Sequence, residues 1–92
     1  MNATDVQINE NTFTVKLIDG RELAVPLDWF PRLQHGTPEE RNHWNFLAKG
    51  EGIHWPELDE DISVEDLVLG KRSIESQSSI GKWLTKRNKN AV

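Results

Sequence analysis

The chain contains no cysteine, which excludes disulfide bonds, thiolate metal sites and cysteine nucleophiles. No apolar run reaches ten residues, whereas a membrane-spanning helix needs about 20. The first residues also lack the basic start and the apolar stretch of a secretion signal. A length of 92 residues leaves no room for a Rossmann domain or an α/β barrel. These absences predict one small domain without a membrane partner, folded by packing alone in a reducing cytoplasm.

Acidic and basic residues are unevenly distributed along the chain. Residues 1–70 contain five Lys/Arg and fourteen Asp/Glu, a net charge of −9. Residues 71–92 contain six Lys/Arg and one Glu, a net charge of +5. We therefore expect an α+β domain over residues 1–70 and a basic C-terminal helical extension over residues 71–92. The extension either folds back on the acidic domain or binds an acidic partner such as nucleic acid.

The first 27 residues predict a three-stranded antiparallel meander. Apolar and polar residues alternate there in three short runs. Asn9-Glu10-Asn11 is a turn signal between the first two runs. Asp19-Gly20, between the second and third runs, is typical of a tight hairpin turn in which both central residues have positive φ. Pro26 has no amide hydrogen, so the third strand ends there or lies at a sheet edge.

A helix is predicted to cover one face of this meander. Thr37-Pro38-Glu39-Glu40 combines an N-cap residue, a proline at the first helical position and the acid of a capping box. We expect the helix to run to about Ala48, because Trp44, Leu47 and Ala48 share one helical face. Residues 53–55 then predict a short fourth strand, which a proline ends.

The remainder of the chain predicts an acidic connector over residues 57–61 and two further helices. Ser63 is a typical N-cap for a short helix that Gly70 ends. Residues 71–79 are polar and rich in serine, which indicates a linker. The apolar residues that follow share one face of a C-terminal helix and are Ile80, Trp83 and Leu84.

Residues 52–67 carry the most specific pattern in the chain: a strand ending in Trp55-Pro56, an acidic stretch and a Ser-capped short helix. Together with the opening hairpin, over about residues 3–70, this pattern resembles the small bacterial family catalogued as domain of unknown function 2442. The resemblance implies a compact α+β domain, similar to the N-terminal domain of an uncharacterised bacterial protein, without known catalytic residues. Some members carry a helix-turn-helix after this domain, and some are encoded beside another small protein in arrangements that look like toxin–antitoxin pairs. Residues 71–92 lie outside the pattern and are too few for a helix-turn-helix.

No cluster in the sequence predicts catalysis, a metal site or a cofactor. The three histidines, His35, His43 and His54, lack the spacing of a known ligand motif. The acidic stretch lacks the glycine that a calcium loop requires. The serine run at 73–79 has no accompanying Asp–His arrangement, so no activated nucleophile is indicated. We expect the protein not to be an enzyme.

The sequence instead favours a non-enzymatic protein-interaction or regulatory module, antitoxin-like in the sense of the resemblance. The residues expected to meet a protein partner are Asp59, Glu60, Asp61 and Trp83. The alternative is a nucleic-acid-binding transcriptional regulator that acts through its C-terminal extension. Its phosphate-contacting residues would be Lys82, Lys86, Arg87 and Lys89. The open edges of so small a sheet also allow a homodimer.

Overall fold

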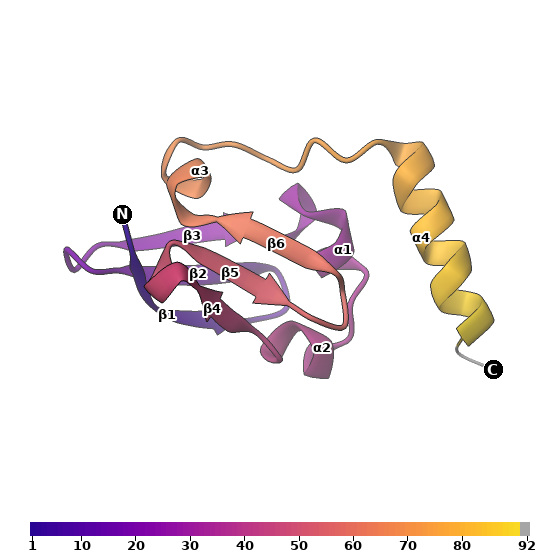
Figure 1. Ribbon diagram of the computed structural model, residues 1–92, viewed down its shortest axis with the longest axis horizontal. Coiled ribbons are helices and arrows are strands. Elements are labelled where there is room, and N and C mark those ends of the chain that lie inside the picture. The colour runs from indigo at the N-terminus through magenta and orange to yellow at the C-terminus, as the bar shows by residue number, and fades with distance from the viewer. Residues whose placement is uncertain (91–92) are drawn as a thin grey trace.

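Two antiparallel three-stranded sheets form the centre of the fold, with strand orders β1-β2-β3 and β4-β5-β6 (Figure 1). The computed structural model describes the backbone of residues 1–90 and the side chains of residues 1–88. Its elements are β1 (Ala3–Ile8), β2 (Thr12–Leu17), β3 (Glu22–Pro26), the 3-10 helix η1 (Leu27–Trp29), α1 (Pro31–Gln34), α2 (Pro38–Asn42), β4 (Asn45–Leu47), the 3-10 turn η2 (Ala48–Gly50), β5 (Gly52–Trp55), β6 (Glu60–Ser63), α3 (Val64–Val68) and α4 (Gln77–Asn90). The predicted α+β class is confirmed.

The hydrophobic core lies between the two sheets. Alternate residues of the central strand β2 are buried, and they include Phe13 and Val15. The ring of Phe13 meets that of Trp55 in β5 edge-on, with the ring centroids 5.9 Å apart. The indole N–H of Trp55 donates to the carbonyl of Arg41 over 2.8 Å, so its one polar atom is satisfied. The largest side chains of the core therefore join the sheets without burying an unpaired polar group.

The predicted meander is confirmed as β1-β2-β3, with Pro26 at the end of an edge strand. The predicted hairpin at Asp19-Gly20 is present, but the expected two-residue turn was wrong. The amide of Leu17 donates to the carbonyl of Arg21, so the loop holds three residues, of which only Gly20 has a positive φ (+95°). A three-residue loop with glycine last matches the twist of the flanking strands as well as the tight turn does.

The helix that begins at Thr37 is much shorter than predicted. Its capping box forms, but the helix ends at Asn42 rather than near Ala48. The chain continues as the strand β4, in which Phe46 pairs with Ile53 of β5. The carbonyl of Arg41, which a longer helix would use for its own ladder, instead accepts from the indole of the buried Trp55. Packing against β5 thus replaced the helix that the spacing of apolar residues suggested.

The segment predicted as a lone fourth strand is the central strand of the second sheet. β5 pairs with β4 on one side and with β6 on the other. Residues 60 and 61 of the expected acidic connector belong to β6, where Ile62 pairs with Ile53 and is buried. The turn before β6 is closed by Asp59, which has a positive φ of +50°. The side chains of Glu60 and Ile62 are partly or fully buried, whereas those of Asp61 and Ser63 are exposed. This alternation allows an acidic segment to form a half-buried strand.

The chain beyond Gly70 forms an arm that reaches along one side of the molecule, and we call residues 71–90 the arm and residues 1–70 the body. Gly70, with a φ of +76°, ends α3 as predicted. The segment 71–76 runs past β6 without regular structure and leads into α4, the predicted C-terminal helix (Figure 1). Ser76 caps this helix by accepting from the amide of Ser79 over 3.1 Å.

Candidate functional site

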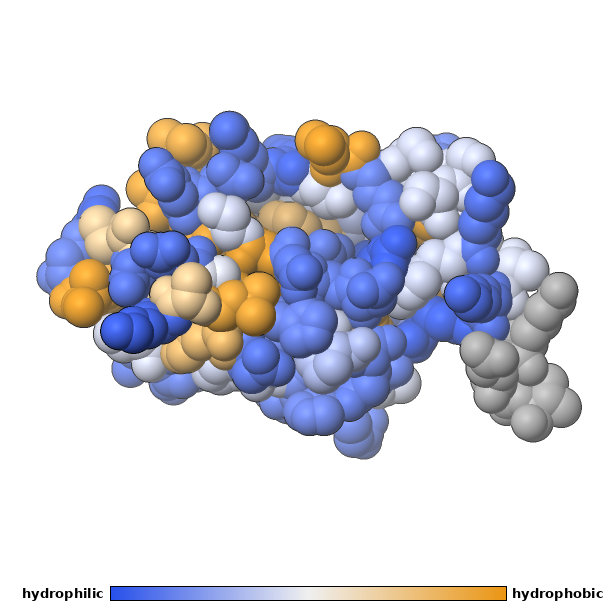
Figure 2. Space-filling view, viewed as in Figure 1, coloured by the Kyte–Doolittle hydropathy of each residue, from blue (hydrophilic) through white to orange (hydrophobic). Residues whose placement is uncertain are grey.

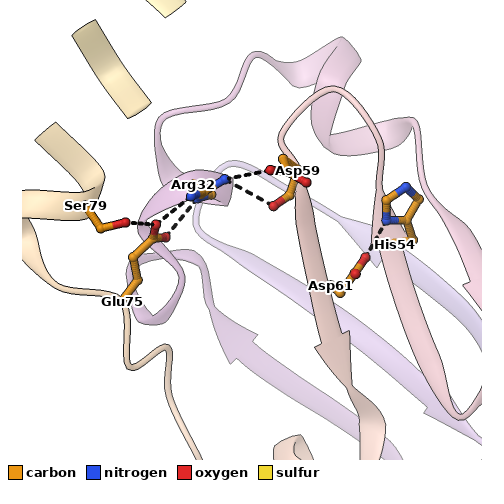
Figure 3. A network of polar contacts seen from close by, with 6 residues as sticks. All are labelled: Arg32, His54, Asp59, Asp61, Glu75 and Ser79. Carbon is orange, nitrogen blue, oxygen red and sulfur yellow. Dashed lines mark hydrogen bonds and ion pairs between the residues drawn. The ribbon is translucent and has the colours of Figure 1, made fainter. Parts of the chain in front are cut away.

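The acidic residues singled out in the sequence lie at the turn between β5 and β6, but their side chains differ in exposure. Asp59 is exposed, and its carbonyl and carboxylate accept from the guanidinium of Arg32 at 3.2 and 3.5 Å (Figure 3). Asp61 is exposed and contacts the ring of His54, its cross-strand partner in β5. Glu60 pairs with the buried Trp55 and is partly buried. Asp59 and Asp61 are therefore the exposed carboxylates of the turn, and each contacts a basic side chain of the body.

The position of Glu60 changes its ionisation. Burial raises the pKa of its carboxyl from 4.5 to about 7, and the nearby carboxylate of Glu75 adds to this effect. The guanidinium of Arg32 opposes it by favouring the charged form. The acidic turn thus carries one carboxyl, that of Glu60, whose pKa lies near neutral pH.

An ion pair fastens the beginning of the arm to the body. The guanidinium of Arg32, in α1, donates from two nitrogens to the two carboxylate oxygens of Glu75 at 2.8 and 2.6 Å (Figure 3). The hydroxyl of Ser79 donates to the same carboxylate at 2.6 Å. These bonds hold the pKa of Glu75 below its ordinary value. This two-point geometry is the strongest form of an Arg–carboxylate contact.

A second ion pair holds the end of the arm, and here the arginine belongs to the arm and the carboxylate to the body. Arg87 of α4 donates to both carboxylate oxygens of Glu40 in the body, at 3.0 and 2.8 Å. This pairing lowers the pKa of Glu40 from 4.5 to about 2. Trp83 lies between the two arginines, with its ring 5.1 Å from the guanidinium carbon of Arg32 and 4.8 Å from that of Arg87. Trp83 therefore anchors the arm on the body and is only partly exposed.

The four basic residues predicted to contact nucleic acid do not share one environment. Arg87 is engaged with Glu40 and Trp83. Lys82 and Lys86 are exposed, one helical turn apart, and line the same shallow hollow on α4. The side chain of Lys89 lies outside the part of the chain that the structure describes. Two of the four residues thus share an outward face of the helix.

A groove of about 950 Å³ lies between β6 and the extended part of the arm. We call it the β6 groove, and its lining residues are Phe30, Glu60, Asp61, Ile62, Ser63, Asp66, Lys71, Arg72, Ser73, Ile74 and Glu75. The groove is lined by two basic side chains, and each has a partner. The ammonium nitrogen of Lys71 lies 3.7 Å from a carboxylate oxygen of Asp66, and the guanidinium carbon of Arg72 lies 4.3 Å from the ring centroid of Trp29. Ile74 stands fully exposed on the rim, and Figure 2 shows such isolated hydrophobic spots on an otherwise hydrophilic face.

The sequence did not indicate the contacts that join arm and body. Arg32 and Glu75 are 43 residues apart, and Glu40 and Arg87 are 47 apart. The opposite net charges of the two segments were the single signal, and that signal does not say which residues pair. The β6 groove was also missed, because it depends on a strand that the acidic composition concealed.

Residues 1–90 contain neither a candidate metal-ligand cluster nor a candidate membrane-spanning helix. No group of three His, Cys, Asp or Glu side chains in this range is placed to hold a metal ion. His43 contacts Glu57, and His54 contacts Asp61, as separate pairs. None of the helices within the same range combines the length and the apolar character needed to cross a bilayer.

Comparison with known proteins identifies the family but no function. The family model described as "Protein of unknown function (DUF2442)" matches residues 3–73, which is more than half of the chain, so the chain belongs to this family. No curated protein matches. A crystal structure of a protein of unknown function from Rhodospirillum rubrum is similar, with a TM-score of 0.72 and 23% identity over 83% of this chain and 94% of that one. A solution structure of an uncharacterised protein from Chromobacterium violaceum has a TM-score of 0.68 and 26% identity over 94% of this chain and 75% of that one.

Proposed function

We propose that this member of the DUF2442 family is a non-enzymatic interaction module, and that it binds a protein partner on the acidic side of the β6 groove. The observation that carries the proposal is the groove itself, which joins an exposed apolar side chain to exposed negative charge. Asp61 and the neighbouring Asp59 are exposed, while the fully exposed Ile74 supplies apolar surface at the groove. An apolar centre with charge at its border is the usual composition of a protein interface.

The absence of enzyme activity is part of this proposal, and two contacts support it. The hydroxyl of Ser79 donates to Glu75, whose carboxylate is paired with Arg32 and has a lowered pKa, so this acceptor is a weak base for activating it. The ring of His54 contacts Asp61 on the exposed face of the sheet rather than in an enclosed cavity. We further propose a cytoplasmic location, in keeping with a chain that contains no cysteine.

A nucleic-acid-binding regulator remains a second candidate, and Lys82 and Lys86 favour it. Their ammonium groups lie on one exposed face of α4, where they can reach adjacent phosphates. The strongly acidic body opposes such binding, because it repels a duplex at low salt. An antitoxin-like role would be a narrower form of either function, in which a toxin is the protein partner.

The two candidates are separated by capture from the lysate of the source organism, with and without nuclease. We compare the natural protein with the variant Asp59→Asn/Asp61→Asn and with the control Glu10→Gln/Glu22→Gln, which removes the same charge from exposed positions of the other sheet. Asparagine suits position 59 because it tolerates positive φ.

The protein-interaction proposal expects one stoichiometric protein that survives nuclease, is lost from the Asp59/Asp61 variant and is kept by the control. Equal recovery by all three forms would refute the acidic side as the interface. Recovery of nuclease-sensitive nucleic acid, lost on Lys82→Ala/Lys86→Ala, would establish the regulator in its place.

A further inference from the structure

The outer edge of β6 differs from the other three sheet edges of the described residues. β1 is approached at its start by Gly50, so closely that a Cβ there would lie 2.3 Å from the carbonyl oxygen of Ala3. β3 contacts α3 and ends in Pro26, which cannot donate a hydrogen bond. β4 is only three residues long. Natural proteins close open edges by such means, because free backbone groups pair with other chains.

β6 has no neighbouring strand on its outer side and opens there onto the β6 groove. Its four residues all line this groove, and residues 71–75 of the arm form the opposite wall (Figure 1). The arm does not pair with β6, because this segment has no strand structure and the amide of Ser73 donates to Trp29 instead. β6 and residues 71–75 therefore form the two walls of the groove. The outward-facing backbone groups of β6 have no neighbouring strand there.

We infer that the partner supplies an extended segment, which adds to β6 as a fourth strand of the second sheet and lies in the β6 groove. This inference rests on the proposed function and names its binding mode. The 4 residues of β6 offer about 14 Å of edge, at roughly 3.4 Å per residue. Backbone hydrogen bonds along this edge supply affinity that does not depend on sequence. Side chains at alternate positions of the added segment would then decide specificity.

The chemistry of the groove selects a segment with basic and apolar residues. Four acidic and two basic side chains line it. Glu75 pairs with Arg32 and Asp66 with Lys71, while Arg72 stacks on the ring of Trp29. The carboxylate of Asp61 contacts the ring of His54 but is 66% exposed, so it can attract a cation. The fully exposed Ile74 on the opposite wall offers apolar contact for the intervening residues. A lysine or arginine alternating with a β-branched residue fits this pattern.

The test starts from a displayed library of random decapeptides, selected on the full chain. We expect enrichment of peptides that alternate basic and apolar residues. In a titration followed by amide NMR, such a peptide should shift residues 60–63 and 71–75 and leave β4 and α4 unchanged. Asp61→Lys should weaken its binding tenfold or more, whereas Glu22→Lys, on the first sheet, should leave it within twofold.

Backbone methylation of the selected peptide distinguishes strand addition from simple charge attraction. In an added strand, every second amide faces β6 and the others face away. N-methylation of one alternate set should therefore abolish binding, while methylation of the other set should change it little. Equal effects of the two sets, acidic selected peptides, or shifts confined to α4 or β4 would overturn strand addition. The lysate capture described above would still decide the proposed function by itself, since it does not depend on how the partner is bound.

Discussion

The body and the arm are held by contacts of different kinds. In the body, buried apolar residues of both sheets and of α1 pack into one cluster, and Phe13, Leu33 and Trp55 have no exposed surface. The arm is held by two partly exposed Arg–carboxylate pairs, by Trp83 between their arginines and by the buried Ile80. Charge screening does not weaken apolar burial, whereas it does weaken partly exposed ion pairs.

This difference has a functional meaning for the β6 groove. One wall of the groove belongs to the rigid body, and the other belongs to the arm. We therefore expect the arm to separate from the body more readily than the body unfolds. A partner that enters the groove would contact the extended part of the arm without disturbing the core.

The largest expected effect contrasts one tryptophan of each region. Trp55→Ala should lower the free energy of unfolding by about 3–5 kcal/mol, because it removes a fully buried ring and frees the carbonyl of Arg41. Trp83→Ala should cost only about 1 kcal/mol, since its ring is partly exposed and stacks on two arginines. Denaturant unfolding followed by far-ultraviolet circular dichroism measures both. Equal losses would mean that the arm belongs to the same cooperative unit as the core.

A second contrast, within the body, concerns two glycines with positive φ. Gly50→Ala should destabilise the protein by about 1–3 kcal/mol for the left-handed backbone and by more for its clash with the backbone of Ala3. Gly70→Ala is the matched control, because it has the same kind of φ and nothing within 4 Å of the new methyl group. The difference between the thermal midpoints of the two variants measures the destabilisation caused by the clash with Ala3 alone. If the two variants lost equal stability, Gly50 would be constrained by its φ alone.

The third contrast uses pH, because the pKa values of Glu40 and Glu60 are shifted in opposite directions. The folded-state pKa of Glu40 is lowered to about 2 by Arg87, so its stabilisation is present above pH 4.5 and is lost as the pH falls toward 2. The folded-state pKa of Glu60 is raised to about 7 by burial, so its stabilisation is present below pH 4.5 and is lost as the pH rises through 7. Each effect is about 1–2 kcal/mol after allowance for solvent screening.

Two neutral variants assign these effects to their residues. Glu40→Gln keeps an oxygen for the amide of Thr37 but should remove the loss of stability between pH 4.5 and 2. Glu60→Gln should flatten the decline between pH 4.5 and 7. Urea midpoints across both ranges, together with the indole N–H signal of Trp83, show whether the arm or the body responds. A response of the Trp83 signal to Glu60→Gln alone would place control of the arm at the acidic turn instead of at Glu40.

The elements that could be predicted from the sequence are those that local signals determine. The capping box at Thr37, the cap at Ser63 and the stop at Gly70 involve residues within a few positions of one another. The meander was predictable because alternation and turns are also local. β4 was not, because the apolar spacing around Phe46 fits a helix as well as a strand and pairing with a distant strand decided between them.

The candidate site was predictable in its charges but not in its geometry. The acidic residues 59–61 were identified by composition, yet their side chains point to different surroundings, because Glu60 occupies an inward register position beside Trp55. Trp83 was singled out by its place on the basic helix, but its two alternatives, anchoring and exposure, could not be separated without knowing where Arg32 lies. Contacts between residues more than 40 positions apart leave no trace in one sequence.

The smallest expected effect tests whether the arm folds independently of the body. Gly81 lies inside α4, and a methyl group there would meet nothing within 4 Å. Gly81→Ala should therefore stabilise the helix by roughly 0.5–1 kcal/mol. If arm and body are separate units, hydrogen exchange should slow at the amides of α4, while the exchange of β2 and β5 stays the same. Slower exchange in the sheets as well would show that the two regions unfold together, and the arm would then be part of the domain rather than a detachable wall of the β6 groove.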